Sequence, residues 1–262
     1  MRARPNPLPW IYRWRTNLIQ TPLFALITSV CGSLSLLVSL VDKKGNAQHR
    51  IARIWARGCV WASGSKLRVV GAENLHKHQM AVYTSNHTSY MDTPVIFAAL
   101  PFQFRILARK ELWTIPFIGW YLDRSRQMPI DTNNPRATLS SLGAGARALR
   151  SGMALFVFPE GRRTPDGELR PFLSGAAYLA IRAQVPLVPM ALRGVYELLP
   201  IHTHHFYPGE LTLKIGEPLE TAGMTVRQTD ELTARLRVAI ENLKEPRSTA
   251  AAEEVAAVGT EV

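Results

Sequence analysis

The sequence predicts an α/β domain, built on a mixed and largely parallel sheet flanked by helices, with an N-terminal membrane-associated helical segment. Three observations lead to this prediction. Short apolar runs alternate with amphipathic stretches between residues 66 and 244, which is the pattern of an α/β fold. An uncharged stretch of 26 residues precedes them, between Arg15 and Asp42. The formal net charge is +11, and most of it lies near the N-terminus.

The charge distribution limits the possible partners. Residues 1–66 hold ten basic residues and one acidic residue, Asp42, a balance of +9. Such a concentration indicates either nucleic acid or an anionic membrane surface. We expect a membrane lipid surface and no nucleic acid, because no nucleic-acid-binding motif is present and the uncharged segment would have no role. Cys31 and Cys59 both lie in apolar surroundings, which fits a reducing cytoplasm better than a disulfide framework or a metal site.

The uncharged segment from Leu18 to Val41 is long enough to cross a bilayer. Pro22 and the pair Gly32-Ser33 could break it into a helical hairpin. Basic residues flank both ends, so a re-entrant hairpin keeps both flanks in the cytoplasm, whereas a single span keeps only one there. A buried core helix of a soluble domain is the third alternative.

Residues 48–63 predict a basic amphipathic helix. Its apolar face would carry Ile51, Ile54, Trp55, Gly58 and Ala62, and its basic face Arg50, Arg53 and Arg57. Such a helix lies on anionic lipid or packs on the domain with its basic face in solvent. We expect the former, and we therefore assign residues 1–65 to a membrane-associated helical segment.

Residues 66–244 are expected to form an α/β domain, and 245–262 a disordered tail, because that tail has few large apolar residues. The predicted strands are Lys66–Val70, Met80–Tyr83, Phe104–Leu107, Met128–Asp131, Ala154–Phe158, Leu187–Ala191 and Leu211–Ile215. Helices are predicted over 90–100, 135–150 and 174–183, with a closing amphipathic helix over 225–243.

The loop after the second predicted strand carries His87, and Asp92 follows at the start of a helix, with Thr88 or Ser89 as its candidate N-cap. If His87 precedes the helix, the chain can fold back and let Asp92 accept a hydrogen bond from Nδ1–H. The second nitrogen, Nε2, is then free to act as a base. Alone, this spacing fits equally well a loop histidine and a carboxylate that interacts with the helix dipole.

A second polar loop follows the strand Ala154–Phe158. It presents a carboxylate, a glycine, two guanidinium groups and a hydroxyl, on Glu160, Gly161, Arg162, Arg163 and Thr164. Arginine binds phosphate through a planar fork. A charged hairpin is the alternative, since Thr164-Pro165-Asp166-Gly167 is a turn sequence.

Two further stretches give weaker signals. The strand beginning near Val185 contains Pro186 and Pro189, so we expect it to be irregular or near an edge of the sheet. The cluster His202, His204 and His205 lacks an acidic or cysteine neighbour, which favours a surface loop over a metal site.

Taken in order, N-H-x4-D, F-P-E-G-x-R-[ST] and V-P-x-V-P resemble the motifs of the glycerolipid acyltransferases, in particular the bacterial 1-acylglycerol-3-phosphate acyltransferases. The resemblance covers about residues 66–216. It implies a catalytic pair at His87 and Asp92, preceded by Asn86. It also implies glycerol-phosphate binding at residues 160–164 and an acyl site at Val185, Pro186 and Pro189. Where relatives often show Ile-Asp-Arg, this chain has Ile130-Asp131-Thr132; Arg124, Arg126 and Arg136 are the candidate substitutes for the missing arginine.

The resemblance implies acyl transfer from acyl-CoA or acyl-carrier protein to the hydroxyl of a lysophospholipid acceptor. The acceptor is expected to be 1-acyl-sn-glycerol-3-phosphate, which gives phosphatidic acid at the cytoplasmic face of the inner (cell) membrane, with no cofactor and no metal. His87 would be the general base. No G-x-S-x-G serine and no catalytic cysteine candidate argues for an acyl-enzyme. The alternatives are an acyltransferase for another lysolipid and a non-catalytic basic membrane-binding protein.

Overall fold

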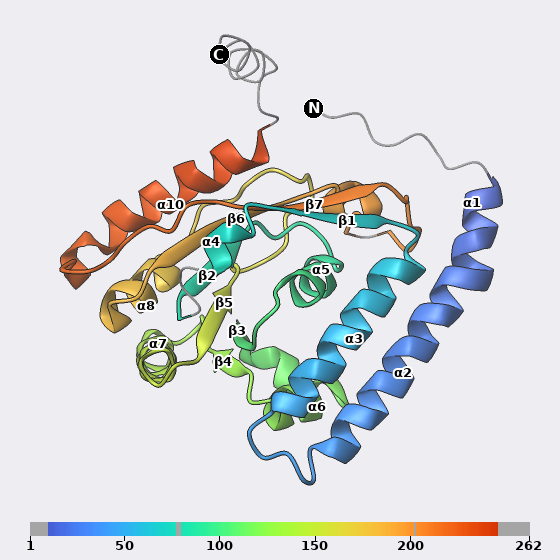
Figure 1. Ribbon diagram of the computed structural model, residues 1–262, viewed down its shortest axis with the longest axis horizontal. Helices are drawn as coiled ribbons and strands as arrows, with labels where there is room; N and C mark the ends of the chain where they lie inside the picture. The colour runs from blue at the N-terminus through green and yellow to red at the C-terminus, as the bar shows by residue number, and fades with distance from the viewer. Residues whose placement is uncertain (1–9, 77–79, 202, 246–262) are drawn as a thin grey trace, which may run out of the picture.

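The computed structural model describes residues 10–76, 80–201 and 203–245, and at its centre lies a seven-stranded sheet (Figure 1). The strands are β1 (Lys66–Val70), β2 (Val82–Ser85), β3 (Phe104–Arg109), β4 (Met128–Ile130), β5 (Ala154–Val157), β6 (Leu187–Arg193) and β7 (Glu210–Ile215). Their order across the sheet is β1-β7-β6-β2-β5-β3-β4. The last five strands in this order are parallel, and β7 is antiparallel to β6, so the predicted mixed and largely parallel sheet is confirmed.

The helices in chain order are α1 (Trp10–Arg15), the π-helical turn η1 (Thr16–Gln20), α2 (Thr21–Val38), α3 (Asn46–Ala62), α4 (Glu73–His76), α5 (Asp92–Ala99), the 3₁₀ turn η2 (Lys110–Thr114), α6 (Ile118–Arg124), α7 (Pro135–Arg150), α8 (Gly175–Ala183), α9 (Val195–Leu198), the 3₁₀ turn η3 (Val226–Gln228) and α10 (Thr229–Lys244). Each of the seven predicted strands is present within two residues of its expected start. The helices predicted over 90–100, 135–150, 174–183 and 225–243 correspond to α5, α7, α8 and α10.

Two hydrophobic clusters cover the two faces of the sheet. One combines buried residues of α3 and α5 with strand residues such as Tyr83 and Phe104. The other combines α7, α8 and α10 with strand residues such as Val82 and Leu155. Neighbouring strand residues belong to opposite clusters because successive side chains in a strand point to opposite faces. Figure 1 shows α3 and α5 on one side of the sheet and α7, α8 and α10 on the other.

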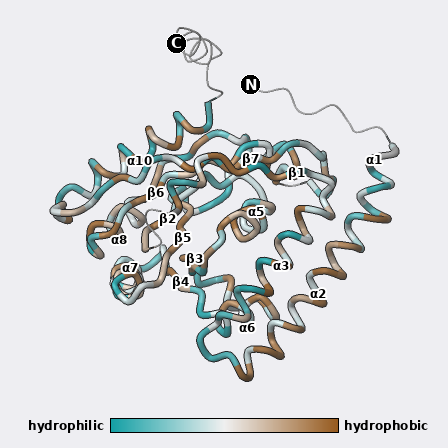
Figure 2. The backbone as a smooth tube through the Cα atoms, viewed as in Figure 1, coloured by the Kyte–Doolittle hydropathy of each residue, from teal (hydrophilic) through white to brown (hydrophobic). Residues whose placement is uncertain are grey.

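The N-terminal uncharged segment forms one continuous helical run through α1, η1 and α2, so Pro22 and Gly32-Ser33 do not break it into the expected hairpin. Pro22 lacks an N–H for the helical ladder, and the π-helical turn η1 lies directly before it, where the i→i−4 pattern is already interrupted. By length and composition, the helix Arg13–Val38 could cross a membrane, and little of it is buried in the protein. Figure 2 shows its hydrophobic colouring along α2. The alternative of a buried core helix is therefore wrong.

Polar side chains in η1 fix this helix to the domain. The Gln20 side-chain amide donates hydrogen bonds to the carbonyl oxygens of Ala62 and Ser63, at 3.2 and 2.8 Å. Thr16 donates to Gln20 and accepts from the backbone N–H of Phe206. These contacts join the start of the apolar helix to the end of α3, and α2 then runs beside α3 (Figure 1).

The structure corrects our interpretation of residues 48–63. The helix α3 is packed on the domain, which was the alternative to lying on lipid. Ala52, Ala56 and Cys59 are buried in the same cluster as the sheet and α5. Ile54, by contrast, is largely exposed. Cys31 and Cys59 are both free thiols.

The proline-containing strand β6 also departs from expectation, because it lies inside the sheet between β7 and β2. Pro186 precedes the strand. Pro189 is opposite Thr84 of β2, but the pairing with β7 begins only at Met190. Pro189 therefore precedes the first residue of β6 that pairs with β7, and its missing N–H costs no hydrogen bond between these strands. An interior strand can accommodate a proline at this position.

Candidate active site

His87 and Asp92 meet at the carboxyl end of β2. His87 follows β2 by two residues, and Asp92 is the first residue of α5. His87 Nδ1 lies 2.8 Å from Asp92 Oδ2. A carboxylate only accepts hydrogen bonds, so Nδ1 carries the proton and Nε2 is the unprotonated nitrogen of the neutral ring. Among the described residues, none donates to or accepts from Nε2. The contact predicted from the sequence is therefore present.

Asp92 is completely buried, and its Oδ2 atom accepts two hydrogen bonds besides that of His87. The donors are the backbone N–H groups of Thr88 and Ser89, at 2.6 and 2.8 Å. The predicted N-cap at Thr88 or Ser89 is wrong: the N-cap residue is Met91, and its side chain forms no capping hydrogen bond. Instead, the Asp92 side chain bends the preceding loop back over the helix start, which brings His87 within reach.

The imidazole of His87 stacks on Phe158, with ring centroids 3.8 Å apart and an angle of 13° between the planes. Phe158 directly follows β5, the neighbour of β2 in the sheet. The stack therefore fixes the plane of the imidazole, while Asp92 fixes its rotation. Sequence analysis did not single out Phe158. Its position, just beyond a strand that pairs in parallel with β2, was the available signal.

Glu160 connects the two loops through the backbone. One carboxylate oxygen accepts from the N–H of His87 at 2.7 Å, and the other accepts from the N–H of Arg170 at 2.9 Å. Both oxygens are therefore used within the protein, although we had expected Glu160 to bind substrate. Burial raises the pKa of Glu160 to about 7, and the two N–H donors only partly counteract that effect.

Asn86 and Thr164, two other predicted substrate ligands, also bind the protein. The side-chain amide of Asn86 accepts from Leu192 N at 2.7 Å and donates to Leu192 O at 3.0 Å, which attaches the loop to β6. The backbone N–H of Thr164 donates to His87 O at 3.0 Å. Both residues are buried. They hold the His87 loop in place and present no free group to a substrate.

Two arginines of the second loop remain available for an anion. Gly161, at φ 69°, adopts the left-handed conformation that glycine tolerates best, and a Cβ there would stand 2.8 Å from Leu173. This turn directs the next two side chains outward. Arg162 is exposed. The Arg163 guanidinium lies over the ring of Tyr90, 4.0 Å from its centroid, within the histidine loop.

Thr132 stands where relatives often have an arginine, and three arginines are candidate substitutes for it. One of the three lies at the edge of the sheet where His87 lies. The five parallel strands end at one edge, where His87 lies. Arg136, in the first turn of α7, follows β4 and so lies at this edge. Arg124 and Arg126 precede β4, which places them at the opposite edge. Asp131 is paired with Lys110, a second cation at the carboxyl edge.

The predicted acyl-site residues do not lie beside His87. Val185 and Pro186 precede β6, at the amino edge of the parallel strands, whereas His87 lies at the carboxyl edge. Pro189 is buried within the strand and accepts from Gly216 N. None of the three side chains borders the imidazole, and their role in an acyl site stays a prediction.

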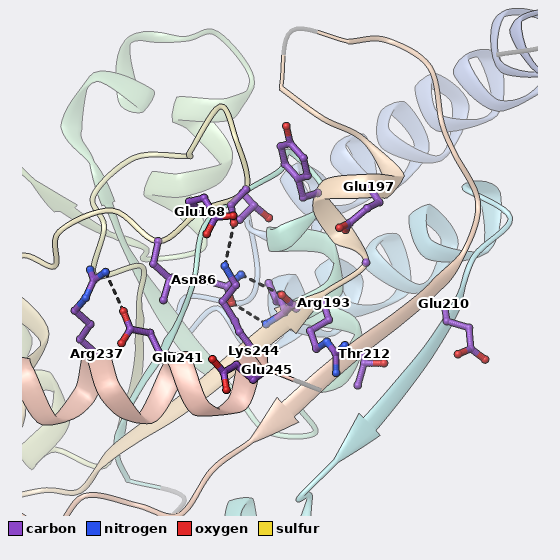
Figure 3. A pocket seen from close by; sticks show the side chains of 16 residues that line it. Asn86, Glu168, Arg193, Glu197, Glu210, Thr212, Arg237, Glu241, Lys244 and Glu245 are labelled. Atoms are coloured by element: carbon purple, nitrogen blue, oxygen red, sulfur yellow. Dashed lines mark hydrogen bonds and ion pairs between the residues drawn. The ribbon is translucent and has the colours of Figure 1, made fainter. Parts of the chain in front are cut away.

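A cavity of about 740 Å³ opens on the other side of the histidine loop (Figure 3). Asn86 and Thr88 line it, but His87 does not. Its charged lining mixes acids with bases: Arg237 is paired with Glu241, and Lys244 donates to the carbonyl oxygen of Gly167. Because the His87 side chain does not line this cavity, we do not assign the reaction to it.

Residues 66–193 match the model of the acyltransferase family. This chain is similar to the family over that range. The 1-acyl-sn-glycerol-3-phosphate acyltransferase of Limnanthes douglasii is 31% identical over 173 residues, which cover 66% of this chain and 61% of the relative. The protein of the same name from Pseudomonas aeruginosa is 29% identical, over 83% of this chain and 87% of its own length.

This chain also resembles a solved structure. The crystal structure of the 1-acyl-sn-glycerophosphate acyltransferase PlsC from Thermotoga maritima superimposes with a TM-score of 0.73 at 25% identity, covering 88% of this chain and 96% of that one. The match with the Limnanthes relatives spans about three fifths of their length. Among the described residues, no group of three or more His, Cys, Asp or Glu side chains is arranged to hold a metal ion. His202 lies outside the described residues, and His204 is exposed.

Proposed function

We propose that this protein is a 1-acyl-sn-glycerol-3-phosphate acyltransferase. It would transfer a fatty acyl group from an acyl-CoA or acyl-carrier-protein thioester to the free hydroxyl of the lysophospholipid, giving phosphatidic acid. The observation that carries the proposal is the His87–Asp92 hydrogen bond of 2.8 Å, which leaves Nε2 without a partner in the part of the chain that the structure describes. Relatives that carry this activity in their names support the choice of substrate.

In the proposed reaction, His87 Nε2 removes the proton of the acceptor hydroxyl as its oxygen attacks the thioester carbonyl carbon. The new C–O bond forms, the C–S bond breaks, and the proton passes from the imidazolium to the leaving thiolate. Asp92 stabilises the imidazolium because its buried carboxylate lies on Nδ1. The stack on Phe158 keeps Nε2 in a fixed direction throughout.

We assign the acceptor phosphate to the arginine pair of the second loop. Arg163 lies over Tyr90, which belongs to the same loop as His87, so an anion held by its N–H edges would stand close to the base. Guanidinium groups suit this role because they form two parallel hydrogen bonds with a phosphate. Arg136 and Arg162 supply further positive charge at the same edge of the sheet.

The apolar N-terminal helix and the lipid acyltransferase relatives indicate association with a membrane. We propose that α2 lies within one leaflet, at the cytoplasmic face of the cell membrane. It runs beside α3, whose inner face is part of the domain core, and η1 is hydrogen-bonded to the end of α3. A helix attached in this way does not separate from the domain to cross the bilayer. The basic residues at both ends would remain on the cytoplasmic side.

The test is acyl transfer by the purified full-length chain, with product lipids identified by mass spectrometry. Lysophosphatidate and zwitterionic lysolipids are offered as acceptors, with acyl-CoA and acyl-carrier protein as donors. We expect His87→Ala to lower turnover by roughly 10²–10⁴-fold or more, as is typical for loss of a general base. His204→Ala, which changes an exposed histidine, is the matched control.

Three results would overturn parts of the proposal. Turnover by His87→Ala at the wild-type rate would exclude His87 as the base. Transfer to a zwitterionic lysolipid but not to lysophosphatidate would identify a different acyltransferase. Binding to anionic vesicles with no transfer to any acceptor would favour a non-catalytic membrane-binding protein.

A further inference from the structure

The segment between β3 and β4 exposes a group of large apolar side chains. Ile115, Phe117, Ile118 and Trp120 are 42%, 68%, 47% and 58% exposed. They follow one another within six residues at the start of α6. Other exposed apolar residues of the domain, such as Leu139 on α7, are more isolated in the sequence. A contiguous apolar surface of this kind usually marks a contact with another molecule.

The backbone holds this group outward in a defined shape. Phe117 has φ 63° and ψ −48°, the conformation of a γ-turn, which is strained and rare. Gly119 fits so closely that a Cβ would stand 2.2 Å from Trp113 O. Ile118 N and Gly119 N donate to the carbonyl oxygens of Pro116 and Ile115, both at 2.7 Å. The Phe117 and Trp120 rings meet edge to face with centroids 5.0 Å apart. A strained turn persists only where its surroundings fix it, so the exposure is built into the fold.

The group continues the apolar surface of the N-terminal helix. Helix α6 contacts α2, and Figure 1 shows it near the C-terminal end of that helix. In that half of α2 and just beyond it, Leu34, Leu37 and Leu40 are exposed. Two segments about 80 residues apart in the sequence therefore contribute to adjoining apolar surface.

Basic residues border this surface. Lys43 and Lys44 connect α2 to α3, and Arg124 and Arg126 lie at the end of α6; all four are exposed, and none forms an ion pair among the described residues. The two pairs are close, because a Cβ on Gly45 would stand 3.3 Å from Ser125 O. Asp123 is the exposed acid among them. Aromatic side chains bordered by cations are typical of the interface between a bilayer and water.

We propose that the α6 segment, residues 115–120, is a second lipid-binding element that inserts Phe117 and Trp120 into an anionic bilayer beside α2. This inference rests on the proposed membrane association, and it adds an element that lies outside the N-terminal segment. Two points of attachment fix the orientation of the domain, whereas α2 alone would allow rotation about its axis. The α6 segment follows β3, whose carboxyl end lies at the same edge of the sheet as His87. Helix α6 then leads to the amino end of β4, so the second attachment would fix the side of the domain next to β3 and β4 at the lipid surface.

The test compares two double variants of the full-length chain. Phe117→Asn/Trp120→Gln removes the two rings and leaves a polar side chain at each position. Leu139→Gln/Val238→Gln removes two exposed apolar side chains from α7 and α10, on the other side of the sheet, and is the matched control. Partition into vesicles of phosphatidylglycerol and phosphatidylcholine is measured by flotation. We expect the α6 variant to bind roughly 10-fold or more weakly, given the usual gain from burying such side chains, and the control to bind as the wild type does.

Acyl transfer to a short-chain, water-soluble acceptor separates this proposal from the proposed function. The α6 variant should retain that turnover while it loses vesicle binding. Binding equal to that of the wild type would overturn the α6 proposal and leave the enzyme assignment intact. Unchanged vesicle binding together with a change from dimer to monomer would identify the patch as a contact between copies of the chain, and would overturn it equally.

A conservative variant covers the case in which the double variant fails to fold. Trp120→Phe keeps an aromatic ring, so we expect the fold to survive. The fluorescence that it removes from the wild-type spectrum belongs to Trp120. That component should be quenched by vesicles containing brominated acyl chains. A component insensitive to the bromolipid would show that Trp120 stays in water, and the proposal would be wrong.

Discussion

The two loops around His87 and the two apolar helices α2 and α6 differ in which kind of side chain they bury and which they expose. In the loops, polar groups are buried and hydrogen-bonded to one another: Asp92 accepts from three donors, and Glu160 from two. In the helices, apolar side chains such as Leu37 and Trp120 are exposed. Neither arrangement is favourable in an isolated water-soluble domain. Each indicates a function, because polar burial orients reacting groups and apolar exposure recruits a surface.

The difference between the regions gives a direct experimental separation. Changes in the loops should alter turnover and leave vesicle binding unchanged. Changes in the exposed faces of α2 and α6 should alter vesicle binding and leave turnover with water-soluble substrates unchanged. The predictions below test the loop side of this comparison, from the largest expected effect to the smallest.

The largest effect is expected from Asp92→Asn. The Oδ1 atom of Asp92 is buried and has no hydrogen-bond partner among the described residues, so asparagine can place its NH₂ there and keep its oxygen on the same three donors. What is lost is the negative charge that stabilises the imidazolium. We expect turnover to fall by about 10²–10⁴-fold with vesicle binding unchanged. Asp230→Asn, at an exposed position in the first turn of α10, is the control. Loss of both properties in Asp92→Asn would show that the two regions are not independent.

The fold was predictable because it depends on local patterns. Apolar runs specified all seven strands, and helical periodicity specified the helices between them. The strand from Leu187 was predicted to be irregular or near an edge because it contains prolines. The sequence does not show that pairing with β7 begins only after Pro189. The helix over 46–62 was predicted to lie on lipid because it has a basic face. The residues of that face do not show what the opposite face contacts. That face is complementary to α5, a relation between distant segments.

The site was predictable in part. His87 and Asp92 were identified because the contact depends on one short loop. Asn86, Glu160 and Thr164 were assigned to substrate because the sequence shows a polar group but not its partner. Their partners are backbone groups, such as those of Leu192 and Arg170. Every residue type carries the same backbone groups, so the sequence does not show which of them lies near a given side chain. Exposure of residues 115–120 was equally invisible, since an apolar run predicts burial by default.

A smaller but distinctive effect is expected from Glu160→Gln. The amide would turn one N–H group toward the backbone donor of His87 or Arg170, and an unsatisfied buried donor costs about 1–3 kcal/mol. We expect turnover to fall by roughly 10-fold or more, because the His87 loop shifts, with only a small change in the KM for the acceptor. Glu168→Gln, in the same loop but exposed, is the control. A rise in KM alone would instead mean that Glu160 touches the substrate.

The pH dependence of the wild type provides a second measurement on Glu160. Its pKa is raised from 4.5 to about 7 by burial, so the folded chain takes up a proton in this window that the unfolded chain does not hold. The free energy of unfolding should therefore decrease as pH rises from about 4.5 to 7. Turnover should increase over the upper part of this window, because the ionised carboxylate accepts both N–H groups. Chemical denaturation and initial rates across pH should show that the glutamine variant loses both contributions.

Arg163→Ala is expected to act on binding more than on chemistry. The KM for lysophosphatidate should rise by about 10-fold, since a charged hydrogen-bonding pair contributes roughly 1.5–3 kcal/mol. Lysine at this position should restore part of the effect, because it keeps the charge and loses the fork. Steady-state kinetics with lysophosphatidate and with a zwitterionic lysolipid make the comparison. Equal losses on both acceptors would assign Arg163 to the structure of the loop.

The smallest effect is expected from a change of Tyr90, whose ring is stacked against the Arg163 guanidinium. A guanidinium stacked on a ring keeps its N–H edges free, and at an exposed site such a contact contributes about 0.5–1 kcal/mol, or roughly two- to fivefold in affinity. Tyr90→Leu should therefore raise the KM for lysophosphatidate by that factor, whereas Tyr90→Phe should preserve it. In the Arg163→Ala background, Tyr90→Leu should have no further effect, because the group that it positions is gone. If the two substitutions are additive, Tyr90 acts independently of Arg163, and Glu160, Thr164 and the stack of His87 on Phe158 join the two loops without it.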